Sequence, residues 1–211
     1  MPDHQGGRLA RTPRPATLEQ ARAVVDAAAR LFAERGYHGT SMRDIAQEFS
    51  LNPGSLYLYI RSKEQLLQSI CEFVLDLLER NLDDVESLGT DTMTALRLIA
   101  RGELGIHVEH RDWYRVYETE YRHLTGDALE RVLKGRRTLD VRLQDILPDG
   151  EGGGVLRSLA PEPIASAAYS ENLHRVYERV GSTGGISVSQ FADAYTDMVL
   201  EGWRPRAAET Q

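Results

Sequence analysis

The sequence predicts an all-α fold of about nine helices, with a small N-terminal three-helix domain followed by a larger helical domain. Two observations support this fold class. Apolar residues recur at helical spacing through most of the 211 residues, and no segment alternates as a half-buried strand does. The helical stretches are separated by glycine, proline and capping residues, as at Gly36 and at 148–150.

The first two helices have clear boundaries. The first begins near Leu18, because Thr17 and Gln20 match a capping box, and Gly36 supplies the left-handed residue that ends it. The second follows Thr40-Ser41, where either hydroxyl can act as the cap. Its apolar residues fall on one face, so we expect it to pack on the first helix.

The third helix is expected to be brief. A tight turn at 50–52 precedes it, Asn52 caps it, and Pro53 takes its first position, where the missing N–H costs nothing. It runs to about Tyr59 and is polar at its start and aromatic at its end, which makes it a poor core element. Such a helix suits the major groove of DNA, where the N-terminal residues of one helix face the base edges.

Side chains around this helix are candidate DNA contacts. Those of the third helix offer donors and acceptors to bases, Gly54 lets the backbone approach closely, and Arg43 and Lys63 are placed to hold phosphates. The N-terminus of the helix that begins at Ser62 is a further anion site. The candidate DNA-binding residues are Thr40, Ser41, Arg43, Asn52, Pro53, Gly54, Ser55, Tyr57, Tyr59 and Lys63.

Residues 18–67 resemble the DNA-binding domain of the TetR family of bacterial transcriptional regulators. The matching residues are Ala28, Leu31, Phe32, Gly36, Tyr37, Thr40, Ile45, Ala46, Ser55, Leu56, Tyr57, Tyr59, Lys63, Glu64, Leu66 and Leu67. Ser50 departs from the family pattern, which usually has glycine there and so requires a positive φ that is uncommon for serine. Ile60 stands where the family usually has phenylalanine. The resemblance implies a homodimeric, ligand-responsive repressor of transcription.

The charge distribution fits a protein that docks on DNA by one end. The net charge is −7, but residues 1–63 hold nine Lys and Arg against six Asp and Glu, a net +3, which leaves −10 for the remainder. Residues 1–16 are expected to form a disordered basic arm that either enters the minor groove or stays a solvated tail. A single buried Cys71 and the lack of a signal or membrane segment predict a cytoplasmic protein.

The rest of the chain is expected to form a ligand-binding and dimerisation domain over residues 64–211, behind a DNA-binding domain over 17–63. Its expected helices are 62–84, which connects the domains, and 91–110, 112–124, 127–147, 163–180 and 187–203. The last two resemble the family's dimerisation pair, and Val176 and Phe191 are expected in the subunit contact. The dimer would place two recognition helices about one DNA turn apart on a palindromic operator.

A pocket for a small hydrophobic effector is expected among the helices between 91 and 180. The segment 113–124 is dense in aromatic and titratable groups, and is similar to that of family members that sense acyl-coenzyme A or other lipid-derived acids. Aromatic drugs and other hydrophobic effectors remain alternatives. The candidate ligand contacts are Arg97, Trp113, Tyr117, Tyr121, Tyr169 and Asn172. Binding is expected to tilt the 62–84 helix and spread the two recognition helices.

A metal site is the sharpest rival hypothesis. Two Glu-x-x-His pairs on facing helices, with two further carboxylates, can hold a di-metal centre in a helical bundle. The ligands would be Glu120 and His123, Glu171 and His174, with Glu103 and Glu118. The alternative is that these are ordinary ion pairs on helix surfaces. We find no motif for catalysis and none for a cofactor, so an enzyme is not expected.

Overall fold

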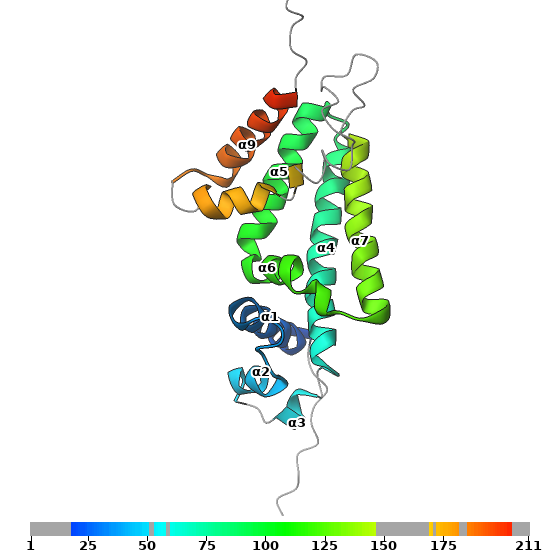
Figure 1. The fold of residues 1–211 in the computed structure, drawn as a ribbon, viewed down its shortest axis with the longest axis vertical. Coiled ribbons are helices and arrows are strands. Elements are labelled where there is room, and N and C mark those ends of the chain that lie inside the picture. Colours follow the sequence, from blue (N-terminus) through cyan, green and yellow to red (C-terminus); the bar gives the residue numbers. More distant parts are fainter. Residues whose placement is uncertain are drawn as a thin grey trace, which may run out of the picture.

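The computed structural model describes residues 18–50, 53–57, 60–146, 169–170, 172–181 and 185–203. Every regular element in these ranges is a helix, so the predicted all-α class is confirmed. The molecule is elongated, with α1, α2 and α3 at one end and a bundle of further helices above them (Figure 1). Among the described helices, none has the length and apolarity needed to cross a bilayer.

The helices at the lower end are α1 (Leu18–Arg35), α2 (Met42–Glu48) and α3 (Pro53–Leu56). The chain leaves α1 through Gly36 at φ +77°, as the sequence predicts. Ser41 begins α2 with a reciprocal capping box: its hydroxyl accepts from the Asp44 N–H, and the Asp44 carboxylate accepts from the Ser41 N–H. The predicted start of each of these three helices is therefore confirmed.

The turn between α2 and α3 contains Ser50 at φ +51°, the conformation for which the family usually supplies glycine. The third helix is shorter than predicted, because α3 ends at Leu56 and Tyr57 forms a turn. Leu56 is buried whereas Tyr57 is exposed, so only the apolar end of this helix joins the core. Ile60 is buried, as expected for an apolar residue at that position.

The long helix α4 (Lys63–Ser87) joins the two ends of the molecule. Ser62 caps this helix: its hydroxyl accepts from the Gln65 N–H, and the Gln65 side chain accepts from the Arg61 N–H. One buried stripe continues along the whole helix, including Cys71 as predicted. α4 therefore packs on α1 near its start and on α5 and α7 further along.

The bundle around α4 is built from α5 (Thr92–Glu109), α6 (Arg111–Thr119), the 3-10 turn η1 (Tyr121–His123) and α7 (Gly126–Ile146). The single helix predicted over 112–124 is wrong, because α6 stops at Thr119. The Glu120 side chain accepts a hydrogen bond from the Tyr37 N–H, which lies beyond the end of α1. This long-range contact coincides with the break between α6 and η1 and has no counterpart in the local sequence pattern.

The C-terminal part packs beside α5. Residues 169–170 and 172–176 are helical, followed by the π-helical turn η2 (Tyr177–Gly181) and by α9 (Val188–Trp203). Ser187 and Gln190 exchange hydrogen bonds at the start of α9, so the helix predicted over 187–203 begins where expected. Tyr169 and Leu173 are buried between α5 and α9. The predicted residues 163–168 lie outside the described ranges, as does the arm at 1–16.

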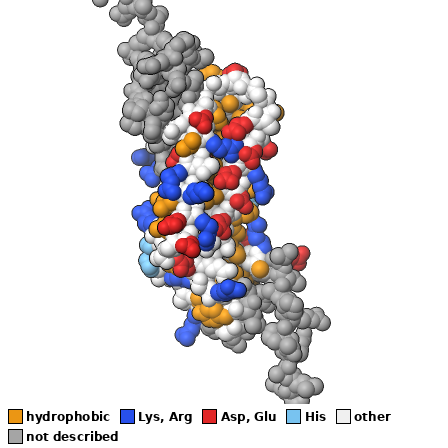
Figure 2. Space-filling model, turned by 90° about the vertical axis from the view of Figure 1, so that its right-hand side faces the viewer, with side chains coloured by type: hydrophobic (Ala, Val, Ile, Leu, Met, Phe, Trp, Pro, Cys, Tyr) orange, Lys and Arg blue, Asp and Glu red, His pale blue; other side chains and the backbone are white. Residues whose placement is uncertain are grey.

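The face of the bundle over α7 carries basic and acidic side chains intermixed, without a large patch of either sign (Figure 2). Arg142 on α7 pairs with Asp83 and Glu86 on α4 at 2.8 and 2.9 Å, and Arg131 pairs with Glu72 at 3.4 Å. Partly exposed pairs of this kind add little stability. They do leave this face poorly suited to a polyanion.

Candidate DNA-recognition face and effector cavity

The end formed by α2 and α3 presents an exposed polar and aromatic surface, at the bottom of Figure 1. Ser41, Arg43 and Tyr57 are exposed, and Tyr57 keeps 53% of its surface open to solvent. With Thr40 and Lys63 they line one shallow hollow between the start of α2 and the end of α3. The structure therefore brings five of the predicted DNA contacts together.

Two of these five residues are engaged within the domain. Thr40 is only 1% exposed, and its hydroxyl lies 3.2 and 3.1 Å from the carbonyl oxygens of Leu31 and Gly36. The structure does not support the phosphate contact expected of the Thr40 side chain, because the hydroxyl closes the turn after α1 instead. The Lys63 ammonium donates to the carbonyl oxygens of Tyr37 and Thr40, at 2.8 and 2.9 Å.

Lys63 also lies 4.1 Å from the centre of the Tyr37 ring. Its partial burial lowers the pKa of the ammonium. The first residue of α4 is thus tied to the turn that precedes α2. Of the other predicted contacts, Gly54 is exposed, and Pro53 and Ser55 belong to α3, while Asn52 and Tyr59 lie outside the described residues.

A second contact holds the same turn against the bundle. Glu120 Oε2 accepts from the Tyr37 N–H at 3.0 Å and lies 3.5 Å from His123 Nε2. The His123 ring stacks on the Tyr37 ring at a centroid distance of 5.5 Å, and its Nδ1 lies 3.1 Å from His38 Nε2. The segment that follows α6 therefore contacts the residues directly before α2.

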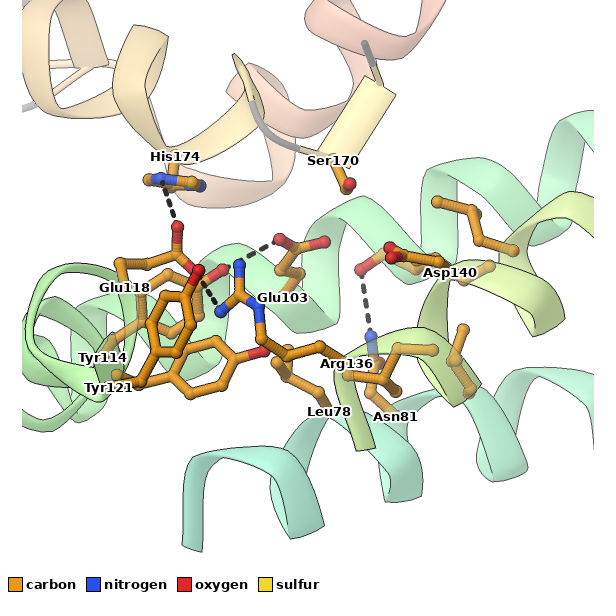
Figure 3. Close-up of a pocket in the computed structure, with 15 residues that line it drawn as sticks. Leu78, Asn81, Glu103, Tyr114, Glu118, Tyr121, Arg136, Asp140, Ser170 and His174 are labelled. Carbon is orange, nitrogen blue, oxygen red and sulfur yellow. Dashed lines mark hydrogen bonds and ion pairs between the residues drawn. The ribbon is translucent and has the colours of Figure 1, made fainter. Parts of the chain in front are cut away.

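The bundle contains a half-open cavity of about 290 Å³ between α4, α5, α6 and α7, with Ser170 and His174 on its remaining side (Figure 3). Its apolar wall consists of Leu78, Leu82, Ile99, Leu139 and Leu143. Its charged and titratable lining includes Glu103, Glu118, Tyr121, Arg136, Asp140 and His174. An apolar wall with a few convergent polar groups is typical of a small-molecule site.

The polar end of the cavity is centred on Glu118. Arg136 Nη1 lies 3.1 Å from Glu118 Oε1, and His174 Nε2 lies 3.6 Å from Glu118 Oε2. The Arg136 guanidinium also lies 4.7 Å from the ring centres of both Tyr117 and Tyr121. Figure 3 shows these side chains converging from α6, η1, α7 and the C-terminal segment.

Burial and neighbouring charged groups determine the protonation of Tyr114 and Arg136 at the polar end of the cavity. It raises the pKa of Tyr114 well above the usual value, with Glu103 and Glu118 adding to the effect, so the phenol stays protonated. The Tyr114 hydroxyl donates to Glu103 Oε1 at 2.9 Å. Burial alone would lower the pKa of Arg136, but Tyr117 and Glu118 outweigh it and raise the pKa, so the guanidinium stays charged.

Of the six predicted ligand contacts, Tyr117 and Tyr121 line the cavity. Arg97 does not, because its guanidinium is paired with Asp197 of α9. Trp113 does not either, because its indole N–H donates to Asp26 Oδ1 of α1 at 3.0 Å. Both side chains hold helices together outside the cavity.

The other two predicted ligand contacts also lie elsewhere. The Tyr169 hydroxyl donates to the carbonyl oxygen of Leu96 at 2.6 Å and lies 3.0 Å from the Thr196 hydroxyl, inside the core between α5 and α9. Asn172 is exposed and is not part of the cavity lining. The sequence pattern predicted that Trp113 and Tyr169 face inward, but not the helices that they contact.

The sequence prediction did not assign Glu103, Glu118, Arg136 and His174 to the effector site. A usable signal was present for Glu103, which lies on the buried stripe of α5 between Ala100 and Leu104. A carboxylate within an apolar stripe is rarely buried without a partner, so its position alone pointed to a polar site.

The di-metal alternative is not supported. Glu120 and His123 lie at the junction with Tyr37, whereas His174 contacts Glu118 at the cavity, and Glu171 lies outside the described residues. In the described ranges no group of three or more His, Cys, Asp or Glu side chains is arranged to hold a metal ion. The contact between Glu120 and His123 agrees with the alternative given above, an ordinary ion pair without a metal.

Comparison with known proteins agrees with this architecture. Residues 24–70 match the family model of bacterial regulatory proteins of the tetR family, and residues 90–203 match a tetracyclin repressor-like C-terminal domain. The HTH-type transcriptional repressor KstR2 of Mycolicibacterium smegmatis is 30% identical over 187 residues, covering 85% of this chain and 88% of the relative. KstR2 of Rhodococcus jostii is 28% identical over 181 residues, with the same coverage.

Solved structures share the fold. The structure of KstR2 of Mycobacterium tuberculosis superposes with a TM-score of 0.80 at 20% identity, covering 91% of this chain and 98% of that one. AibR, solved in complex with isovaleryl coenzyme A and operator DNA, has a TM-score of 0.72 at 26% identity and covers 85% and 97%. Together with the DNA-recognition end and the cavity, these matches show that the chain belongs to the TetR family and is a ligand-responsive, DNA-binding transcriptional repressor rather than an enzyme.

Proposed function

We propose that this repressor binds a palindromic operator as a homodimer through α2 and α3, and is released when a small effector enters the cavity. The observation that carries this proposal is that one helix, α4, both lines the cavity and begins at the DNA-recognition end. We assign DNA binding to residues 17–63 and effector binding and dimerisation to 64–211. Operator binding places its action in the cytoplasm, with the chromosome.

The apolar wall of the cavity suits an effector with a hydrophobic body. A volume of about 290 Å³ accommodates a small acyl or aromatic group but not a whole acyl-coenzyme A molecule. AibR was solved with isovaleryl coenzyme A, and an acyl-coenzyme A is a candidate effector here if its acyl end enters the cavity and the nucleotide stays outside. Aromatic effectors of similar size remain the alternative.

Two connections would carry the signal to DNA. α4 places Leu78 and Asn81 on the cavity and Lys63 on the turn before α2. Glu118 lines the cavity, and Glu120, two residues further on, accepts from the Tyr37 N–H. An effector that prefers one position of these elements shifts the population toward the spacing of recognition helices that fits the operator less well.

The outer face of α9 fits the proposed subunit contact. Gln190, Ala194 and Met198 are exposed at successive i, i+4 positions, and Met198 keeps 62% of its surface open. Phe191, expected in this contact, is instead 7% exposed and belongs to the core between α5 and α9. We therefore assign the subunit contact to the side of α9 that carries Ala194 and Met198, in place of Phe191.

Selection of bound sequences from a randomised DNA pool tests the proposal. We expect enrichment of an inverted repeat, and loss of binding for Tyr57→Ala without loss of thermal stability, because that side chain is exposed. Leu88→Ala removes a comparably exposed apolar side chain at the far end of α4 and serves as the matched control. No enriched sequence, or equal affinities for the two variants, would contradict the assigned face.

A further inference from the structure

We propose that the end of the effector that enters the cavity carries hydrogen-bond donors, as an ammonium or hydroxyl group, and that a free carboxylate is rejected. This inference rests on the proposed effector function of the cavity. It narrows the effector class by the chemistry of three carboxylates, one guanidinium and one buried imidazole. An acyl-coenzyme A then stays a candidate only if its acyl end carries a hydroxyl or amino group.

The charged lining is dominated by acceptors. The lining contains three carboxylates, those of Glu103, Glu118 and Asp140, and one guanidinium, that of Arg136. The formal charge of these four side chains is −2. A carboxylate that loses its water here meets like charge, whereas an ammonium or hydroxyl meets oxygen acceptors.

The single cation of the described lining is already neutralised. Arg136 lies 3.1 Å from Glu118 Oε1 and is sandwiched against the Tyr117 and Tyr121 rings at 4.7 Å. An anionic ligand would have to displace the Glu118 carboxylate from this arrangement. The guanidinium therefore balances a residue of the protein instead of offering a site for a bound acid.

His174 supplies an independent indication of a polar ligand end. It lines the cavity at 7% exposure, and its Nε2 faces Glu118 Oε2 at 3.6 Å. Its Nδ1 is buried and has no partner in the described structure. A buried ring nitrogen without a partner costs free energy, and a ligand hydroxyl, which can both donate and accept, removes that cost.

Five aliphatic side chains also line the cavity, so the ligand is an amphiphile with an apolar body and a donor end. Since one water occupies about 30 Å³ in the liquid, the volume is that of about ten waters. A phenyl ring with a short alkyl chain fits this space.

Three probes with one body test the inference: phenylbutylamine, phenylbutanol and phenylbutanoate. Each is titrated calorimetrically into the full-length protein without DNA, near neutral pH. We expect the amine or the alcohol to bind at least tenfold more tightly than the acid. Equal or tighter binding of the acid, or no heat from any of the three, would overturn the inference.

Variants locate the effect. Glu118→Gln should reduce the preference for the amine over the acid at least fivefold, while Glu109→Gln, whose side chain is 78% exposed on α5, should leave it unchanged. His174→Phe should weaken binding of the alcohol. His107→Phe is the control and should leave this binding unchanged, because His107 is similarly buried and also has an Nδ1 without a partner, but does not line the cavity. Identical results for each variant and its control would overturn the inference.

A gel shift on the selected operator, run on the same samples, separates this inference from the proposed function. If the protein binds the operator but binds the acid more tightly than the amine and the alcohol, the inference about the donor end is rejected and the proposed function stands. Failure to bind any DNA, with the expected order of probes, rejects the operator proposal and leaves the cavity chemistry standing.

Discussion

Replacing Lys63 by methionine distinguishes two roles of its ammonium group. One is an intramolecular clamp, in which Lys63 holds the turn before α2, and the other is a contact with a DNA phosphate. The ammonium donates to the Tyr37 and Thr40 carbonyl oxygens and lies over the Tyr37 ring. A hydrogen bond from a charged group contributes about 1.5–3 kcal/mol when it is buried. Lys63 is only partly buried and water can replace it at both carbonyls, so we expect a loss of about 2 kcal/mol for the pair.

Two measurements on the same variant give opposite signatures for the two roles. A loss of about 2 kcal/mol lowers the Tm of a chain of this length by roughly 4–8 °C. A lost phosphate contact lowers the slope of log K against log salt by about 0.9, hence by about 1.8 in a dimer. We expect Lys63→Met to lower the Tm and to leave the salt slope unchanged.

Arg43→Met is the matched control, because Arg43 is exposed beside the same hollow. We expect it to reduce the salt slope by about 1.8 and to leave the Tm unchanged. If Lys63→Met reduces the slope as much as Arg43→Met does, and the Tm does not fall, the clamp is refuted and the phosphate contact predicted from the sequence is restored.

Three further variants or treatments probe other parts of the molecule. Glu120→Gln should reduce effector-induced release at least fivefold in gel shifts while unliganded operator affinity stays within twofold, since it weakens the contacts of Glu120 with Tyr37 and His123; full release would exclude this route. Met198→Asp should give folded monomers by sedimentation, whereas Phe191→Asp should unfold the core; a persistent Met198→Asp dimer places the interface elsewhere. Burial raises the pKa of Cys71 to about 12, so at about pH 8 the thiol is protonated and should react with a disulfide reagent only after unfolding; rapid labelling of the native protein would contradict its burial.

Local signals predicted the N-terminal domain well. Gly36 at φ +77° and a cap of α2 at Thr40 or Ser41 follow from neighbouring residues. The positive φ of Ser50, at +51°, was expected only from the resemblance to the family. The exposure of Tyr57 also follows, because an aromatic residue at the end of a very short helix has little core to join.

The cavity was predicted less completely because long-range packing decides it. Trp113 was expected to contact ligand, but its partner Asp26 is 87 residues away in the chain. Tyr169 was expected there too, but it bonds the Leu96 carbonyl 73 residues away. Helical spacing identifies the face on which a side chain lies, but the neighbouring helix is fixed only when the whole bundle packs. Buried charge within an apolar stripe, as at Glu103, was the more informative signal.

The two proposed routes from the cavity to DNA, through α4 and through Glu120, meet at the turn at 36–40. Lys63 holds the carbonyl oxygens of Tyr37 and Thr40, while Glu120 accepts from the Tyr37 N–H. Lys63 therefore contacts the carbonyl group of Tyr37 and Glu120 contacts its N–H group. Because the two residues share Tyr37 as a partner, the effects of replacing them on the effector response should not add. Because α4 still connects the cavity to Lys63 when Glu120 is changed, Glu120→Gln should leave a residual response, and only the combination with Lys63→Met should remove it.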